Sequence, residues 1–338
     1  MPRKKSSRSL NHRQRERIRK IQQQRVDRLS EKRTQELDQI LDGQLGEEEE
    51  GLVIAHYGLN VEVSDAQGTR FRCAVRETVP ENPVCGDRVV WQRGERSQGV
   101  VVALHARRSV LRRPAAYQRL QTLAANVERM VVITSADQFN PGLVDRYLVA
   151  AGVTGISPII VVNKVDLPHD AEALTVAIMP YQRMGYALFQ VSALEKRGLN
   201  ELKAALGGHI AVFVGHSGVG KSSLISFWEA CHTIKVGEVN PETGKGRHTT
   251  TVARLYPFPE GGGLIDSPGI RTFGLHGVSR EEVPHHFKDI APHLGRCRFS
   301  NCSHLHEPGC GVSAAVEAGE IHPPRLESLH RILDSLPK

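Results

Sequence analysis

The chain contains Gly215-His216-Ser217-Gly218-Val219-Gly220-Lys221-Ser222 directly after the apolar run 210–214. This G-x-x-x-x-G-K-[ST] motif typically joins a strand to a helix and surrounds the phosphates of a nucleotide. Glycine has no Cβ, so the backbone N–H groups of such a loop can approach a polyphosphate closely. A glycine-rich turn without a ligand is the alternative, and the preceding apolar run makes it the weaker one.

We expect residues 215–223, Ser223 included, to bind these phosphates. Lys221 supplies a positive charge for the β- and γ-phosphates, and Ser222 offers its hydroxyl to magnesium. A helix that begins near Lys221 directs its positive dipole end toward the same phosphates. The expected ligand is therefore a nucleoside triphosphate with magnesium.

Apolar runs alternate with helical patterns on the N-terminal side of this motif. We expect strands at 130–133, 158–162, 187–191 and 210–214, and helices near 143–151, 171–183 and 199–206. Apolar strands that alternate with helices indicate a parallel sheet covered on both faces. The sequence therefore predicts an α/β domain, to which we assign residues 115–280.

Two motifs at predicted strand ends indicate that the base is guanine. Asn163-Lys164-Val165-Asp166 matches N-K-x-D, and Ser192-Ala193 follows the next strand. The Asp166 carboxylate can accept hydrogen bonds from N1–H and the 2-amino group of guanine, whereas adenine lacks that amino group and has an acceptor at N1. A backbone N–H at Ser192-Ala193 can reach the guanine oxygen. The set favours GTP over ATP.

Two further runs follow the phosphate loop, Gly246-Arg247-His248-Thr249-Thr250-Thr251 and Asp266-Ser267-Pro268-Gly269. We expect Asp266 to hold magnesium through water and the Gly269 N–H to contact the γ-phosphate. Any of the three threonines can meet magnesium, and we assign Thr250. The base-reading motifs precede the phosphate loop, the reverse of the order in small GTPases, so the sequence predicts a circularly permuted GTPase domain.

The last part of the chain has a metal-binding pattern, C-x(4)-C-x-H-x(5)-C. Its candidate ligands are Cys297, Cys302, His304 and Cys310. Three thiolates and an imidazole complete a tetrahedral zinc shell, which indicates a structural site. Free thiols with an unrelated histidine are the alternative, and His306 or the weaker His293 can replace His304. We expect helical segments near 284–293 and 324–336 to pack on this site, in a small zinc-binding domain over 281–338.

Short alternating runs occupy the region before the GTPase domain. They are 52–55, 60–63, 71–75, 87–91 and 99–104. Five strands with turns between them predict a small closed barrel, for which an RNA-binding OB-fold and a barrel used only for packing are the two interpretations. We assign 51–114 to this domain and read 107–114 as a basic connector.

The N-terminal residues 1–33 hold 13 Lys and Arg against three acidic residues, a net charge of +10 in a chain whose total is +7. Such a segment cannot bury enough apolar surface to order itself, so we expect residues 1–50 to form a disordered basic tail with an acidic linker. The tail either contacts nucleic acid or is a solubilising arm. The composition of the whole chain, 40% hydrophobic and 24% charged, fits a soluble protein without a membrane segment, which we expect to be monomeric and cytoplasmic.

These motifs resemble the bacterial RsgA (YjeQ) family of GTPases that depend on the small ribosomal subunit. The resemblance covers the chain after residue 50 and includes the runs 246–251, 266–270 and 297–310. It implies an OB-fold, a circularly permuted GTPase domain and a zinc-binding domain. It further implies a late assembly factor that binds the subunit and its rRNA and hydrolyses GTP to GDP there.

The residue after the D-x-x-G motif is Ile270, where Ras-type enzymes place a water-orienting glutamine. The resemblance points to His248 as the group that positions the water, and we assign Lys221 and Thr250 as the other catalytic residues. From chemistry alone, His248 is either that group or a solvated loop side chain. Two other classes compete with the enzyme: an RNA-binding scaffold stabilised by GTP, and an ATP-driven RNA remodeller, against which Asp166 argues.

Overall fold

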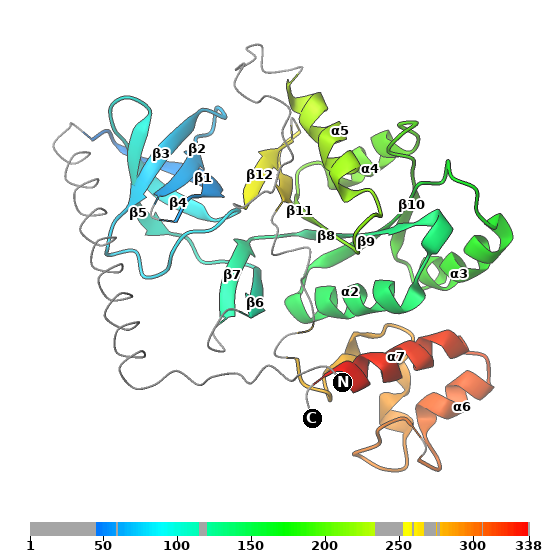
Figure 1. Cartoon of the computed structure of the whole chain (residues 1–338). Coiled ribbons are helices and arrows are strands. Elements are labelled where there is room, and N and C mark those ends of the chain that lie inside the picture. Colours follow the sequence, from blue (N-terminus) through cyan, green and yellow to red (C-terminus); the bar gives the residue numbers. More distant parts are fainter. Residues whose placement is uncertain are drawn as a thin grey trace, which may run out of the picture. The chain divides into compact units, whose positions relative to one another are not determined.

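The computed structural model describes residues 45–58, 60–114, 120–233, 253–258, 260–266, 275, 278–305 and 307–336 (Figure 1). These residues form two compact units. The first contains the residues up to 105 except 53–55 and 84–87, and the second contains those two segments and the chain from 106 onward. No helix in these ranges is long and apolar enough to cross a membrane. The basic tail, the run 246–251, the segment 267–270 and His306 lie outside the described residues.

The first unit is a five-stranded barrel, as the sequence predicts. Its strands are β1 (Glu48–His56), β2 (Asn60–Ser64), β3 (Arg70–Val75), β4 (Arg88–Arg93) and β5 (Gln98–Leu104). They follow the order β1-β2-β3-β5-β4, and β4 pairs back with β1 to close the barrel. The strands alternate inward and outward residues, and the inward Trp91 is fully buried against Phe71 at 4.7 Å between ring centroids. This topology is that of an OB-fold.

The second unit is built on a mostly parallel sheet, which confirms the α/β prediction. Its strands are β8 (Arg129–Ser135), β9 (Ser157–Asn163), β10 (Ala187–Gln190), β11 (Ile210–Val214), β12 (Arg254–Pro257) and β13 (Gly263–Asp266). The order is β10-β9-β8-β11-β13-β12, with only β12 antiparallel to its neighbour. The strands that carry the predicted base-reading motifs, β9 and β10, thus precede β11, the strand before the predicted phosphate loop, as circular permutation requires.

Helices cover both faces of this sheet. They are α2 (Pro141–Thr154), α3 (Ala171–Arg183), α4 (Leu199–Leu206) and α5 (Lys221–Thr233). Val131, Ile159 and Phe213 pack with residues of α4 and α5 in one buried cluster. Val162 of β9 packs with α3 on the opposite face of the sheet. Successive residues of a strand point to opposite faces, so these continuous apolar strands supply both layers of core at once.

The basic connector expected at 107–114 is partly a strand. Residues Val110–Pro114 form β6, which pairs with β7 (Leu120–Ala125) in a separate hairpin. Leu111 and Ala124 are fully buried there, whereas Arg113 points outward and donates to Gln121. The arginines on the outer face hide the short alternating pattern, so the sequence alone favours a connector.

The C-terminal part is less helical than expected. The segment near 284–293 consists of two 3-10 helices, η4 (Val283–His286) and η5 (Ala291–Arg296), followed by α6 (Gly311–Glu317) and α7 (Pro323–Ser335). Pro292 lacks the N–H that the interior of a helix over 284–293 needs, and Phe287 has an extended backbone between the two 3-10 helices. The helix expected at 324–336 is present as α7, whereas the sequence pattern does not predict α6.

Candidate functional site

The predicted nucleotide-binding residues gather at one edge of the sheet. Asn163 ends β9, Ser192 follows β10, Gly215 follows β11 and Asp266 ends β13. These four strands are mutually parallel through β8, so their carboxyl ends lie on the same side. The carboxyl edge of an open α/β sheet is where such folds bind ligands. Four motifs from distant parts of the sequence therefore form a single candidate site.

Two positions of the phosphate loop, Gly215 and Gly220, need glycine because of their backbone angles and because a Cβ there would clash with neighbouring atoms. Gly215 has φ +145°, and a Cβ there would lie 2.2 Å from the carbonyl oxygen of Ile133. Gly220 has φ +93°, and a Cβ there would lie 2.2 Å from Nδ2 of Asn163. Backbone angles in this region suit glycine, and both contacts are with neighbouring parts of the sheet edge. The loop is thus packed against the segment predicted to read the base, whereas a Cβ at Gly218 would meet no atom within 4 Å.

Lys221 is positioned by the loop itself. Its Nζ donates to the carbonyl oxygen of Gly215 at 2.8 Å and to that of His216. The side chain is buried, and it is the first residue of α5, whereas Ser222 and Ser223 in the same turn are exposed. The ammonium group and the N-terminus of α5 therefore place positive charge on the loop that follows β11.

Asn163 connects the phosphate loop to the segment Ser192-Ala193. Its Nδ2 donates to the carbonyl oxygen of Val219 at 2.8 Å, and its Oδ1 accepts from the backbone N–H of Ala193 at 3.1 Å. The side chain is 1% exposed, so both bonds are shielded from water. The sequence marks Asn163 as part of N-K-x-D, but this bridging role depends on three distant segments meeting.

Asp166 is half-buried and its carboxylate is held in the charged form. A hydrogen bond from the Ser192 side chain is the largest cause that lowers the pKa of Asp166. Ser192 is fully buried, and its Oγ also accepts from the Glu195 backbone N–H at 3.0 Å. Lys164 adopts a left-handed backbone with φ +62°, which turns the chain between Asn163 and Asp166. The two segments interpreted from the sequence as base-binding are thus in direct contact.

Other predicted residues are placed only in part. Asp266 is half-buried at the end of β13, opposite Arg254 of β12. The predicted catalytic residues His248 and Thr250, and the γ-phosphate contact Gly269, lie outside the described residues.

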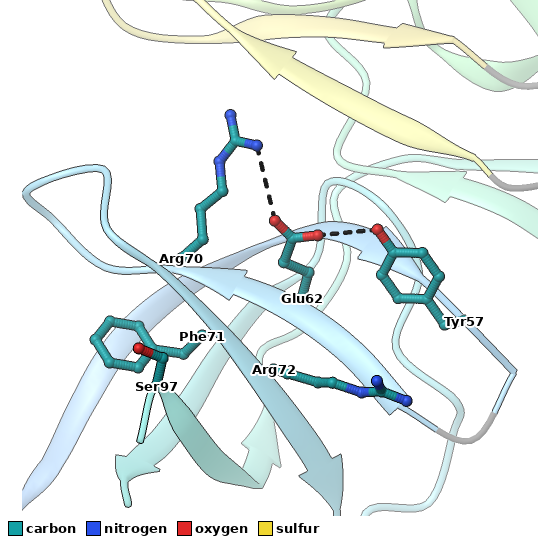
Figure 2. A pocket seen from close by; sticks show the side chains of 6 residues that line it. All are labelled: Tyr57, Glu62, Arg70, Phe71, Arg72 and Ser97. Carbon is teal, nitrogen blue, oxygen red and sulfur yellow. Dashed lines mark hydrogen bonds and ion pairs between the residues drawn. The ribbon is translucent and has the colours of Figure 1, made fainter. Parts of the chain in front are cut away.

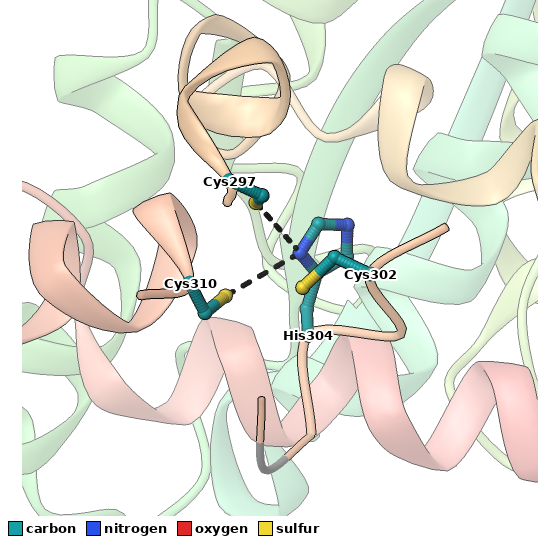
Figure 3. Close-up of side chains that lie close together, drawn as sticks. All are labelled: Cys297, Cys302, His304 and Cys310. Carbon is teal, nitrogen blue, oxygen red and sulfur yellow. Dashed lines mark hydrogen bonds between the residues drawn. The ribbon is translucent and has the colours of Figure 1, made fainter. Parts of the chain in front are cut away.

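The four predicted zinc ligands come together in the C-terminal region (Figure 3). One ligand atom from each of Cys297, Cys302, His304 and Cys310 lies within 4.8 Å of all the others. The Nδ1 atom of His304 is 3.6 Å from Sγ of Cys297 and 3.5 Å from Sγ of Cys310. Zinc bonds of about 2.1 Å to nitrogen and 2.3 Å to sulfur at tetrahedral angles separate ligand atoms by roughly 3.5–3.8 Å. The donor set and its spacing therefore fit a tetrahedral zinc ion.

His293, the weaker alternative ligand, lies apart from this cluster. Its Nε2 is 3.7 Å from a carboxylate oxygen of Glu320, and Arg296 contacts its other ring nitrogen. A different histidine supports the ligand segment: Nε2 of His330 lies 2.7 Å from the carbonyl oxygen of His304. An oxygen acceptor requires the N–H form at this atom, so His330 donates and fixes the His304 backbone.

The barrel carries a pocket of about 410 Å³ on the outer side of β2 and β3. Figure 2 shows Glu62 between Tyr57, whose hydroxyl donates to it at 2.9 Å, and Arg70, which lies 3.8 Å away. Phe71 and Arg72 also line the pocket, and Tyr57 remains 45% exposed. An exposed aromatic ring beside two arginines offers stacking and phosphate contacts to a single-stranded nucleic acid.

Known proteins with the same architecture identify the family. The RsgA GTPase family model matches residues 104–276. The chain is 45% identical to small ribosomal subunit biogenesis GTPase RsgA of Pseudomonas aeruginosa (strain LESB58) over 336 residues, which covers 98% of this chain and 99% of that protein. RsgA of Azotobacter vinelandii (strain DJ) is also 45% identical, over 98% of this chain and 99% of its own.

Two solved structures agree with this assignment. The crystal structure of YjeQ from Thermotoga maritima has a TM-score of 0.69 and 30% identity, and covers 86% of this chain and 99% of that one. The structure of YloQ, described as a circularly permuted GTPase, has a TM-score of 0.68 and 28% identity, with 86% and 97% coverage. The permuted motif order, the sheet edge that assembles it and these relatives lead to one conclusion: the chain belongs to the RsgA family of GTPases, hydrolases that act on GTP.

Proposed function

We propose that this GTPase acts in a late step of small ribosomal subunit assembly, binds the rRNA of the subunit, and hydrolyses GTP faster when bound to it. The observation that carries the proposal is the assembly of four nucleotide motifs at one sheet edge in a chain whose other compact unit is an OB-fold with a basic aromatic pocket. The names of the full-length relatives supply the subunit as the partner.

We assign GTP to the carboxyl edge of the sheet. In this assignment the loop 215–223 binds the phosphates with Lys221, and Asp166 reads the guanine together with the Ser192-Ala193 segment. Asn163 holds these two parts together through its two buried hydrogen bonds. Lys164 contributes its backbone turn, and Gly269 contacts the γ-phosphate.

Two metals complete the proposal. Magnesium accompanies GTP and is held by Ser222 and Thr250 directly and by Asp266 through water. Zinc is held by the Cys3His cluster and shapes the C-terminal region without taking part in the reaction, because its four protein ligands leave no open position.

The water that attacks the γ-phosphate needs a polar group to orient it. Ile270 has none, so we assign this task to His248, which precedes Thr250 by two residues. Contact with the subunit brings the run 246–251 over the γ-phosphate, which couples hydrolysis to release.

The proposal also includes the domain bounds of the chain and its location in the cell. We assign the residues before β1, which begins at Glu48, to the tail and linker, 48–105 to the OB-fold domain, 106–280 to the GTPase domain and 281–338 to the zinc-binding domain. The protein works as a monomer in the cytoplasm, where ribosomal subunits are assembled.

Co-sedimentation with purified small subunits tests the binding part. The protein should pellet with subunits in the presence of a non-hydrolysable GTP analogue and much less with GDP. Arg72→Glu in the barrel pocket should weaken pelleting, whereas Arg88→Glu, the same charge change at an exposed residue of β4 outside the pocket, should not. Equal pelleting with both nucleotides, or equal effects of both substitutions, would refute the nucleotide-dependent contact through this pocket.

A further inference from the structure

We propose that Cys85 is a positioning residue for Asp266, and thereby for the binding of magnesium with GTP. The inference rests on the proposed function only for the role of Asp266 toward magnesium. The segments 53–55 and 84–87 lie among the barrel strands in the sequence, but they belong to the second compact unit, together with the nucleotide motifs. Neither segment is part of a nucleotide or zinc motif.

The thiol of Cys85 contacts the chain at the start of β12. Its Sγ is 3.1 Å from the carbonyl oxygen of Ala253 and 3.4 Å from that of Ile54, and the S–H donates toward both. Cys85 is fully buried, and Ala253 directly precedes Arg254, the first residue of β12. One buried side chain therefore ties β12 to the residue that precedes Ala55 in β1.

Strand pairing connects this contact to the predicted magnesium residue. Ala55 pairs with Arg254, and Arg254 pairs with Asp266, so the three lie in one row across β1, β12 and β13. On its other side β13 is parallel to β11, with Ile265 opposite Val212. Neighbouring strands are only about 4.8 Å apart. Asp266 thus lies one strand from β12 and one strand from the strand that leads into the phosphate loop.

Gly86 brings the same segment close to β13. It has φ +90°, and a Cβ there would lie 2.1 Å from the carbonyl oxygen of Ala125 and 3.3 Å from Cδ1 of Ile265. Ile265 is 1% exposed and directly precedes Asp266. The segment 84–87 therefore lies against the end of β13 as well as the start of β12.

A buried ion pair fixes the segment 84–87 itself. The Arg107 guanidinium donates to both carboxylate oxygens of Asp87, each at 2.8 Å, and the Val84 backbone N–H donates to the same carboxylate at 2.7 Å. The Asp87 side chain is fully buried and that of Arg107 is 8% exposed. A bidentate pair fixes geometry as well as adding energy. Cys85 is therefore a fixed point that holds Ala253, rather than a side chain that follows it.

The test measures how strongly magnesium tightens the binding of a fluorescent, non-hydrolysable GTP analogue to the full-length protein. The dissociation constant is measured with saturating magnesium and with EDTA, and the ratio of the two is the magnesium effect. Cys85→Ala should reduce this ratio by a factor of about 2–10, which corresponds to the net contribution of one hydrogen bond, and should leave the constant in EDTA unchanged. Cys85→Ser keeps a donor and should restore the ratio.

Two results of this measurement would overturn the proposal. One is a ratio for Cys85→Ala that differs from that of the parent by less than about 2-fold, the lower end of the expected effect. The other is an equal loss of affinity with magnesium and with EDTA, because the substitution would then act on the whole site rather than on Asp266. No ribosomal subunits are present, so the result does not depend on whether subunits stimulate hydrolysis.

Cys73→Ala is the matched control. It removes another fully buried thiol, whose Sγ is 3.7 Å from the carbonyl oxygen of Phe71 in its own strand, and it should leave the magnesium effect unchanged. A reduction of the same size in Cys73→Ala would overturn the specific role of Cys85.

A second measurement needs neither nucleotide nor magnesium. Amide hydrogen exchange in β12 and at the end of β13 should be faster in nucleotide-free Cys85→Ala than in the parent, and unchanged in Cys73→Ala, because the lost contact loosens these strands locally. Unchanged exchange in Cys85→Ala would overturn the proposal. If the affinity of the parent protein does not respond to magnesium, the role of Asp266 in the proposed function fails, and hydrogen exchange alone decides whether Cys85 holds these strands.

Discussion

Asp166 and Ser192 show how single residues set the chemistry of the candidate site. The hydrogen bond from Ser192 lowers the pKa of Asp166, so its carboxylate is an acceptor at every physiological pH. Both residues can be found from the sequence, because N-K-x-D and the serine follow predicted strands. The bridge made by Asn163 cannot be found in this way, since its partners Val219 and Ala193 lie 56 and 30 residues away.

Replacing Asp166 with Asn should move base preference from guanine toward xanthine. The amide presents a donor where the carboxylate presented an acceptor, so guanine N1–H and its amino group lose their partner. We expect affinity for GTP to fall by on the order of 10²–10⁴ while XTP gains, measured by competition binding. Asp170→Asn is the matched control, because asparagine caps α3 as well as aspartate does. Unchanged preference for GTP in the Asp166 variant would contradict the assignment of this residue.

Replacing His248 with Ala should leave GTP affinity within a few-fold of the parent protein. Single-turnover phosphate release on the small subunit should fall by ~10²–10⁴, the usual contribution of one positioned acid, base or water-orienting group. A variant that hydrolyses GTP at the parent rate would remove His248 from the mechanism and leave rRNA or a neighbouring hydroxyl to orient the water.

The helices and strands of the GTPase domain could be predicted where their patterns are strong. The helix predicted at 171–183 is α3, which begins after the capping Asp170, and the helix predicted at 199–206 is α4. Weak patterns failed: arginines concealed β6, and the extended Phe287 and Pro292 divide the expected helix into two 3-10 helices. The zinc ligands were predictable because their spacing is short, and the structure brings the same four together.

Replacing Cys302 with Ser should release zinc and loosen the C-terminal region. Structural zinc contributes on the order of 10 kcal/mol of binding free energy to such a site. Zinc binding needs deprotonated ligands, so the variant should lose a larger fraction of its zinc in mild acid than at neutral pH. Metal analysis and thermal unfolding measure both effects. Cys73→Ser changes a buried thiol in the barrel outside the cluster and should leave zinc stoichiometric. Absence of zinc from the parent protein, or an unchanged melting curve in the Cys302 variant, would refute the site.

At the scale of the whole molecule, the sequence predicted which domains occur and in what order, because each has its own periodicity or motif. It could not predict how α7 meets α2. The two helices are joined by Arg325 of α7 and Asp145 of α2, which are 180 residues apart and belong to no motif. Contacts of this kind arise from packing and become visible only in three dimensions.

Removing residues 1–33 should weaken attachment to small subunits mainly at low salt. The segment carries a net charge of +10, and each phosphate contact contributes about 0.9 to the slope of log K against log salt on duplex, less on single strands. Binding measured between about 50 and 200 mM salt should therefore show a shallower slope for the truncated protein. An identical slope would mean that the tail is only a solubilising arm.

The most direct measurement of subunit-dependent GTP hydrolysis is steady-state phosphate release from GTP with and without purified small subunits. We expect subunits to raise the rate by on the order of 10² or more, since in the proposed mechanism contact with the subunit positions His248 over the γ-phosphate. Lys221→Ala should abolish both rates. If saturating subunits bind the protein and leave its rate of phosphate release unchanged, the chain is an RNA-binding scaffold whose GTP turnover is incidental, and hydrolysis is not coupled to subunit assembly.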